Sequence, residues 1–311
     1  MNSTKQKRQK TGRRLKFTND DLWGYIFIAA AMIIFCVFTL YPVFSAIYTS
    51  FFNYKPFGSE FVGLKNYVDT LKYSKFNLFY KAAGNTLIYT VIVVPLSLLL
   101  SFAIAVMIMP FKKKTQSVFK AMYYLPGIAS GVALSVVWLW LYDSSPDGIF
   151  NRILGVFGIP AQNWLSSTKT SMLSLIIMAL LSSHGVRIIT YIAALLGIDN
   201  SYFEAAELDG ASKVRQFFSI TLPMVSPTLF VVLIMRLMAS LKVYDLIYMM
   251  VDQTNPALTS AQSLMYLFYR ESFIAGNKGY ASAIVVWTVL LIGLVTLVQF
   301  IGQKKWVNYE V

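Results

Sequence analysis

A few ionisable side chains lie inside long apolar runs of this chain. Arg187 and Arg236 fall near the middle of two runs, and His184 shares a helix face with Arg187. Lys242 and Asp245 are three residues apart, a spacing that allows an ion pair on one face. A charge within a bilayer costs at least about 2.5–3.5 kcal/mol, so such groups usually face a partner or a cavity. We expect an ion pair for Lys242 and Asp245, a water-filled path at the two arginines, and a histidine bonded to a neighbouring helix.

The residue types give little support to enzyme chemistry. His184 is the only histidine and Cys36 the only cysteine, so catalytic triads, metal clusters and internal disulfides are not predicted. The sequence holds no G-x-x-x-x-G-K-[ST] phosphate loop, so we expect no ATP hydrolysis by this chain. A membrane-embedded transferase is an alternative, but its site would want paired carboxylates or a Ser/His/Asp set. No catalytic residue, metal ligand or cofactor is therefore predicted.

The composition is that of an all-α integral membrane protein. The 311 residues are 57% hydrophobic and 13% charged, with a mean hydropathy of +0.59. A net charge of +13 would suggest nucleic acid in a soluble protein, but here the positive residues lie mostly in tails and short loops. The apolar runs predict six transmembrane helices, at about residues 24–45, 83–109, 121–142, 171–196, 224–250 and 280–303.

The charges between the runs predict the orientation. Residues 1–21 carry seven Lys or Arg, which predicts a basic cytoplasmic tail that contacts anionic lipid. Residues 22–303 form the predicted six-span domain, and residues 304–311 a short second tail. With both termini in the cytoplasm, inner segments hold 15 Lys or Arg and outer loops hold 9. This bias follows the positive-inside rule, so we expect a multi-pass protein of the cell (plasma or inner) membrane.

The polar stretch between the fourth and fifth runs predicts a helical elbow at the cytoplasmic surface. Ser201 followed by Glu204 is a capping-box pattern, so a helix is predicted to begin at Ser201. Gly210 then ends it, because a residue without Cβ permits a turn. A second short helix is predicted from Ser212, and Pro223 fits the first turn of a further helix. Such an elbow suits docking to another protein.

This stretch resembles the cytoplasmic EAA loop of binding-protein-dependent ABC importer permeases. That family's pattern is roughly E-A-A-x-x-D-G-A, an aromatic residue, then I-x-L-P. The chain has EAAELDGA at 204–211, then Phe217 and ITLP at 220–223. The resemblance implies that the elbow, residues 199–223, couples the spans to ATPase subunits. It assigns this role to Glu204, Ala205, Ala206, Asp209, Gly210, Ala211, Leu222 and Pro223.

The resemblance extends over about residues 24–300 and is nearest to the carbohydrate-uptake branch of the family. FVGLKNY at 61–67 matches a sequence motif of that branch. DQTNPALTS at 252–260 departs from the T-G-G-P motif that the family often has after its fifth span. The resemblance implies a type I importer fold and a heterodimer with a second, homologous permease. It also implies two ATPase subunits that hold ATP and Mg²⁺, an extracellular substrate-binding protein, and a sugar or oligosaccharide substrate. A nucleic-acid partner is not expected. A secondary transporter is a further alternative, but no internal repeat is evident.

By position, the resemblance also implies a substrate path along the fourth and fifth spans. Asp245 can neutralise only one of Arg187, Arg236 and Lys242, whereas a substrate carboxylate could form charge-assisted contacts with arginine. A uronate-containing saccharide is one hypothesis. A neutral oligosaccharide is the other, with the arginines satisfied by backbone carbonyls or by the partner permease. The implied path residues are Ser183, His184, Arg187, Arg236 and Ser240, with Tyr244 and Asp245 nearby.

Overall fold

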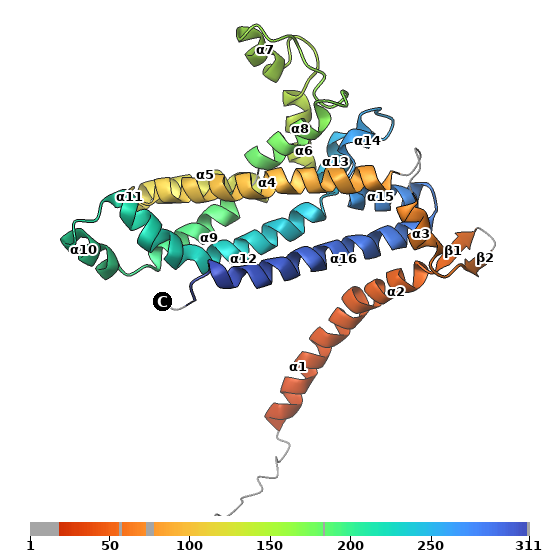
Figure 1. The fold of residues 1–311 in the computed structure, drawn as a ribbon, viewed down its shortest axis with the longest axis horizontal. Coiled ribbons are helices and arrows are strands. Elements are labelled where there is room, and N and C mark those ends of the chain that lie inside the picture. The colour runs from red at the N-terminus through yellow and green to blue at the C-terminus, as the bar shows by residue number, and fades with distance from the viewer. Residues whose placement is uncertain (1–18, 56–57, 73–77, 183, 310–311) are drawn as a thin grey trace, which may run out of the picture. The chain divides into compact units, whose positions relative to one another are not determined.

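The computed structural model describes residues 19–55, 58–72, 78–182 and 184–309. Most of the predicted basic tail and Ser183 lie outside these residues. The chain divides into two compact units, residues 1–48 and 49–311, and each is described by itself. Among the described residues, one small hairpin accompanies an otherwise helical fold (Figure 1). The predicted all-α membrane fold is confirmed.

The first unit is a single apolar helical rod. It comprises α1 (Asn19–Phe35), the π-helical turn η1 (Cys36–Leu40) and α2 (Tyr41–Thr49). The apolar part, Leu22–Thr49, is 28 residues long and therefore long enough to cross a bilayer. The wide turn comes just before Pro42, which cannot donate a backbone hydrogen bond to the preceding turn.

Three helices form the centre of the second unit. They are α4 (Phe79–Ile108), α9 (Gly185–Leu196) and α12 (Leu222–Leu241), which pack on one another, and α16 (Lys278–Gly302) lies along α12 (Figure 1). Buried Phe102, Ile188, Tyr191 and Val225 belong to one apolar cluster among the three. An edge-to-face contact, with ring centroids 5.4 Å apart, joins Phe102 to Tyr191.

The third and fourth spans are broken helices, whereas the sequence predicted each as one. The helices α5 (Lys113–Ile128) and α6 (Gly131–Leu141) meet at 96°, and α8 (Ser171–Leu181) and α9 at 45°. Between α5 and α6 the backbone of Ala129 and Ser130 is extended. The Ser130 hydroxyl then accepts from Ala133 N at 3.1 Å and starts a new helix. Within the described residues, four helices can span a membrane, or six if each bent pair is one span.

The fifth span ends earlier than predicted. The helix α11 (Lys213–Gln216), the π turn η2 (Phe217–Thr221) and α12 run together as one apolar helix, Lys213–Leu241. The chain then turns at Lys242, and the separate helix α13 (Asp245–Met250) follows. The Val243 carbonyl accepts from the Ser263 hydroxyl instead of continuing the helix. The predicted helical spacing of Lys242 and Asp245 is therefore wrong, and in the described part of the chain the two form no ion pair.

A hairpin and a short helix lie at the end of the second unit away from the elbow (Figure 1). The strands β1 (Phe52–Lys55) and β2 (Gly58–Phe61) pair antiparallel, and α3 (Lys65–Leu71) follows. Asn66 donates to the Ser50 and Phe52 carbonyls at 2.8 and 3.0 Å, so the FVGLKNY phrase fixes the hairpin against α3. The other short elements are α7 (Ile149–Val156), α14 (Leu258–Ala261), α15 (Leu264–Tyr269), η3 (Arg270–Ile274) and η4 (Gln303–Lys305).

Candidate functional site

The first helix of the elbow, α10 (Asn200–Leu208), is capped by a residue that the sequence prediction passed over. Asp199 stands at the N-cap with an extended backbone, and its Oδ1 accepts from Ser201 N at 2.9 Å. The hydrogen bond from the Ser201 backbone, and to a smaller extent one from the Ser201 side chain, lowers the pKa of the Asp199 carboxyl. The prediction that Ser201 caps this helix is wrong, because Ser201 already lies inside it. The Asp199 carboxylate, two residues upstream, accepts a hydrogen bond from the Ser201 N–H, and its negative charge is favourable at a helix N-terminus.

The turn after α10 needs a glycine, as predicted. Gly210 has a φ of +72°, in the left-handed region. Ala211 N donates to the Ala206 carbonyl at 2.9 Å, and Gly210 N donates to the Glu207 carbonyl at 3.0 Å. This pair of bonds is a Schellman motif, which satisfies two carbonyls at the helix end. The E-A-A-x-x-D-G-A pattern thus encodes a helix, its stop and a reversal of the chain.

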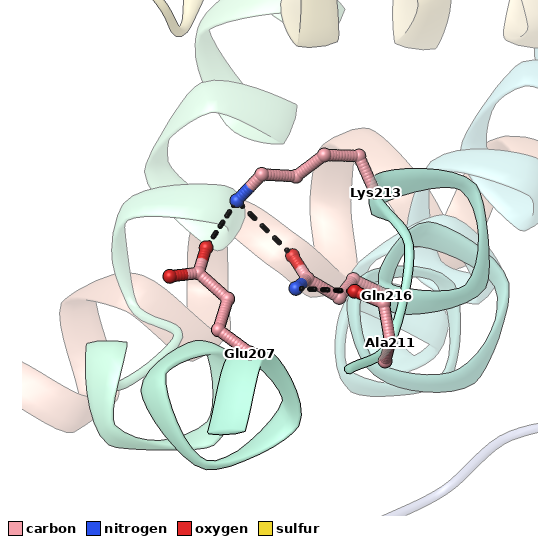
Figure 2. A network of polar contacts seen from close by, with 4 residues as sticks. All are labelled: Glu207, Ala211, Lys213 and Gln216. Carbon is pink, nitrogen blue, oxygen red and sulfur yellow. Dashed lines mark hydrogen bonds and ion pairs between the residues drawn. The ribbon is translucent and has the colours of Figure 1, made fainter. Parts of the chain in front are cut away.

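A polar network joins the two arms of the elbow (Figure 2). Lys213 at the start of α11 forms an ion pair with Glu207 of α10, and its Nζ also lies 3.4 Å from Gln216 Oε1. Gln216 is buried, and its Nε2 donates to the Ala211 carbonyl at 3.2 Å. The hydrogen bond from Lys213, followed by its charge, lowers the pKa of Glu207. These three residues were not predicted from the sequence, although it shows a Glu and a Lys on either side of the glycine turn.

The elbow also presents apolar side chains to its surroundings. Leu208 is 90% exposed, Val214 68% and Phe218 61%. Phe203 and Phe217 point the other way and pack against the apolar cluster of α4, α9 and α12. Ser212 caps α11 by accepting from Arg215 N at 3.3 Å, at the position from which a second short helix was predicted. The elbow is therefore anchored on one side, and its exposed leucine, valine and phenylalanine suit a protein partner.

The second polar site lies between the three central helices. We define the arginine cluster as Ser97 and Ser101 of α4, His184 and Arg187 at the start of α9, and Arg236 of α12. Arg236 Nε donates to Ser97 Oγ and Arg187 Nε to Ser101 Oγ, each at 3.2 Å. The structure thus brings Arg236 of α12 together with His184 and Arg187, which the sequence had placed on one helix face.

His184 is buried, and its hydrogen bonds fix its tautomer. Its Nε2 bonds to the Leu180 carbonyl, which can only accept, so the ring proton is on Nε2. Its Nδ1 then accepts from Arg187 Nη2, 3.2 Å away, and lies 2.8 Å from Ser101 Oγ on α4. The bond to Ser101 agrees with the expectation of a histidine bonded to a neighbouring helix.

Arg236 is half-buried and has neutral partners. Besides Ser97, it interacts with the Tyr89 hydroxyl of α4. Among the described residues Arg236 forms no ion pair. A cation held in this way by neutral oxygens keeps its charge uncompensated, which is costly within a membrane.

The remaining predicted path residues lie elsewhere or outside the described residues. Ser240 is buried and donates to the Leu237 carbonyl of its own helix at 2.9 Å. Tyr244 packs in a tyrosine cluster, and Asp245 beside it is exposed. The ring centroids of Tyr244 lie 5.4 Å from Tyr248 and 5.0 Å from Tyr269. Tyr248 and Tyr269 were not predicted from the sequence. Neither were Ser97 and Ser101, although two serines four residues apart in an apolar run indicate a polar contact between helices.

Known proteins identify what this architecture is. Residues 74–306 match the family described as binding-protein-dependent transport system inner membrane component. The chain belongs to this family. The permease is 31% identical to the probable ABC transporter permease protein YesP of Bacillus subtilis, over 94% of this chain and 93% of YesP. It is 27% identical to the arabinooligosaccharides transport system permease protein AraP of Bacillus subtilis, over 94% and 91%.

A solved structure has the same fold. It is a bacterial ABC transporter involved in the import of the acidic polysaccharide alginate. The likeness has a TM-score of 0.79 and 22% identity, and covers 93% of the permease and 97% of that chain. The predicted family, the importer-permease fold and the inner-membrane location are thus confirmed. The sidedness of the termini and the roles of individual site residues stay predictions.

Proposed function

We propose that this permease is one subunit of an ATP-driven importer of oligosaccharides. Its relatives support a sugar substrate, since they include transport permeases for arabinooligosaccharides, for lactose in Rhizobium radiobacter, and for trehalose/maltose in Thermococcus litoralis. A second, homologous permease completes the pore. Two cytoplasmic ATPase subunits hold ATP and Mg²⁺, and an extracellular binding protein delivers the sugar. Both termini lie in the cytoplasm.

The elbow is the proposed contact with the ATPases. Its second arm, α11, is the first turn of the apolar helix Lys213–Leu241, so a displacement of α10 is transmitted directly to α12. The Lys213–Glu207 ion pair and the glycine turn make the elbow one stiff unit. Such stiffness is what coupling needs, because ATP-driven motion below must switch the spans between outward-facing and inward-facing access. Within the elbow, Glu204, Asp209 and Gly210 form part of the coupling surface.

The arginine cluster carries a finer proposal, that the saccharide is acidic and contains uronate. The deciding observation is that Arg236 is held among three packed helices by neutral oxygens only, within the described residues. A carboxylate passing this point would gain a charge-assisted and bidentate contact. The solved transporter of the same fold is described as importing the acidic polysaccharide alginate, which supports an acidic substrate.

The test is uptake by the whole transporter reconstituted in lipid vesicles. We expect uptake of uronate trisaccharides to stop when ATP is withheld, even with a proton gradient present. Arg236→Gln should lower uptake of the acid about tenfold or more, and should leave its neutral methyl ester within about twofold. Lys242→Gln is the matched control, since Lys242 is an exposed cation just beyond the same helix. Uptake driven by the proton gradient alone would refute the ABC mechanism. Equal effects on acid and ester would refute the acidic substrate.

A further inference from the structure

Two serines of α4 bind the two arginines of the cluster, and each arginine donates from its Nε atom. Arg236 donates from Nε to Ser97, and Arg187 donates from Nε to Ser101, at 3.2 Å in both cases. The serines are four residues apart and therefore lie one turn apart on the same face of α4. Both side chains are fully buried, with 0% of their surface exposed. The repeated contact fixes both guanidinium groups against one helix.

The direction of the two arginine–serine bonds can be assigned. Ser97 Oγ donates its single proton to the Val94 carbonyl at 3.0 Å. Ser101 Oγ also has a single proton, and two acceptors lie within reach of it: the Ser97 carbonyl at 2.7 Å and the unprotonated Nδ1 of His184 at 2.8 Å. A guanidinium group can only donate, so each serine oxygen meets an arginine with a lone pair. The serines therefore hold the arginines as neutral acceptors, because each serine donates its own proton to an acceptor other than the arginine.

A neutral acceptor differs from a carboxylate in one respect that matters here. Aspartate in place of Ser97 would also fix the arginine, but it would neutralise the cation and remove its attraction for an anion. A hydroxyl oxygen fixes the plane of the guanidinium group and leaves its charge in place. Bidentate recognition of a carboxylate requires a guanidinium group whose plane and direction are already set.

We infer that Ser97 and Ser101 are specificity-determining positioning residues, which orient Arg236 and Arg187 for the carboxylate of an acidic saccharide. The inference rests on the proposed function, since it needs an acidic substrate in this path. Ordering a long arginine side chain before the substrate arrives lowers the entropic cost of binding. Loss of either serine should therefore weaken the binding of the acid and leave neutral sugars unaffected.

The experiment uses the complete transporter in lipid vesicles. The probes are trisaccharides of mannuronate, guluronate, galacturonate and glucuronate, each beside its methyl ester. Ser97→Ala and Ser101→Ala should raise the KM for the transported acid about tenfold and change the KM for its ester less than about twofold, with kcat retained. Ser97→Thr should restore the parent KM, because it keeps the hydroxyl. Ser135→Ala is the control, since Ser135 is a buried serine that donates to the Gly131 carbonyl at 2.8 Å and contacts the Met249 sulfur rather than an arginine.

The outcomes separate this inference from the proposal beneath it. An equal loss of acid and ester uptake in the alanine variants would mean that the serines only pack helices, which overturns the inference. If Arg236→Gln discriminates against the acid and the alanine variants do not, the inference fails and the acidic substrate stands. If the parent transports none of the acids, both fail. Should alanine prevent assembly, Ser97→Thr and Ser97→Val have equal volume and differ only in the hydroxyl, so their KM ratio for the acid decides the question.

Discussion

The Lys213 ammonium forms an ion pair with Glu207 across the glycine turn of the elbow (Figure 2). The two residues lie on different helices, α10 and α11, so the contact fixes the angle between the arms. Both side chains are more than half exposed, and an exposed pair of this kind contributes little to global stability. Its effect is therefore expected on the geometry of the elbow rather than on folding.

Removing this pair should loosen coupling. Lys213→Gln and Glu207→Gln are each expected to lower substrate-stimulated ATP hydrolysis about two- to fivefold, with normal amounts of assembled complex. The charge-reversed double variant, Glu207→Lys with Lys213→Glu, should recover part of the loss. The measurement is ATPase rate against substrate in the reconstituted transporter. Wild-type coupling in both single variants would contradict a stiffening role.

The same pair predicts a local response to acid. The pKa of Glu207 is lowered by Lys213, below its ordinary value of 4.5. A lowered folded-state pKa means that the stabilisation is present above the ordinary value and is lost as pH falls through the lowered one. After correction for intrinsic rates, amide hydrogen exchange at α10 and α11 should therefore not depend on pH near neutrality. It should rise selectively below about pH 4.5. Glu207→Gln should abolish the pH dependence; its persistence in that variant would assign it to another group.

Gly210→Leu should uncouple transport without preventing membrane insertion. At a φ of +72° a side chain costs roughly 1–2 kcal/mol, and the turn between α10 and α11 would shift to relieve it. Gly210→Asn is the matched variant, because asparagine tolerates this conformation. We expect uptake to fall about tenfold with leucine and less than about threefold with asparagine. Normal ATP hydrolysis and uptake by the leucine variant would contradict the assignment of the elbow as the coupling element.

Asp199, and not Ser201, should be the sensitive residue at the start of α10. Asp199→Ala removes the acceptor of Ser201 N and should partly loosen the first turn, whereas Ser201→Ala should be near neutral. Hydrogen exchange in the first turn, measured beside ATPase stimulation, distinguishes the two. Asp199→Asn keeps the acceptor and should behave like the parent. A larger effect at Ser201 than at Asp199 would contradict the observed cap.

Gly185→Ala should disturb the packing of α9 on α5. A Cβ at Gly185 would lie 2.5 Å from both the Tyr123 carbonyl oxygen and the Tyr124 Cα, and backbone atoms cannot move aside cheaply. We expect a lower melting temperature and less assembled complex. Gly293→Ala in α16 is the control, because a Cβ there meets nothing within 4 Å. Equal melting temperatures for the two variants would show that α5 can shift.

Local patterns determined the features whose cause lies within a few residues. Hydrophobicity alone placed the long helices α4 and α16, because an apolar run of that length is stable only when removed from water. Gly210 predicted its own turn, since the left-handed conformation is a property of the single residue. The E-A-A-x-x-D-G-A motif around it is a contiguous pattern of residue types, so it indicates the family without any knowledge of how the helices pack.

Tertiary contacts decided what the local patterns left open. The fifth span ends at Leu241, and just beyond it the Val243 carbonyl accepts from the hydroxyl of Ser263, 20 residues further along the chain. The break in the third span depends on two extended residues in an apolar run, where hydropathy shows no interruption. Arg236 meets Ser97 from 139 residues away. Such pairings depend on how helices pack, and the periodicity of each helix alone does not contain that information.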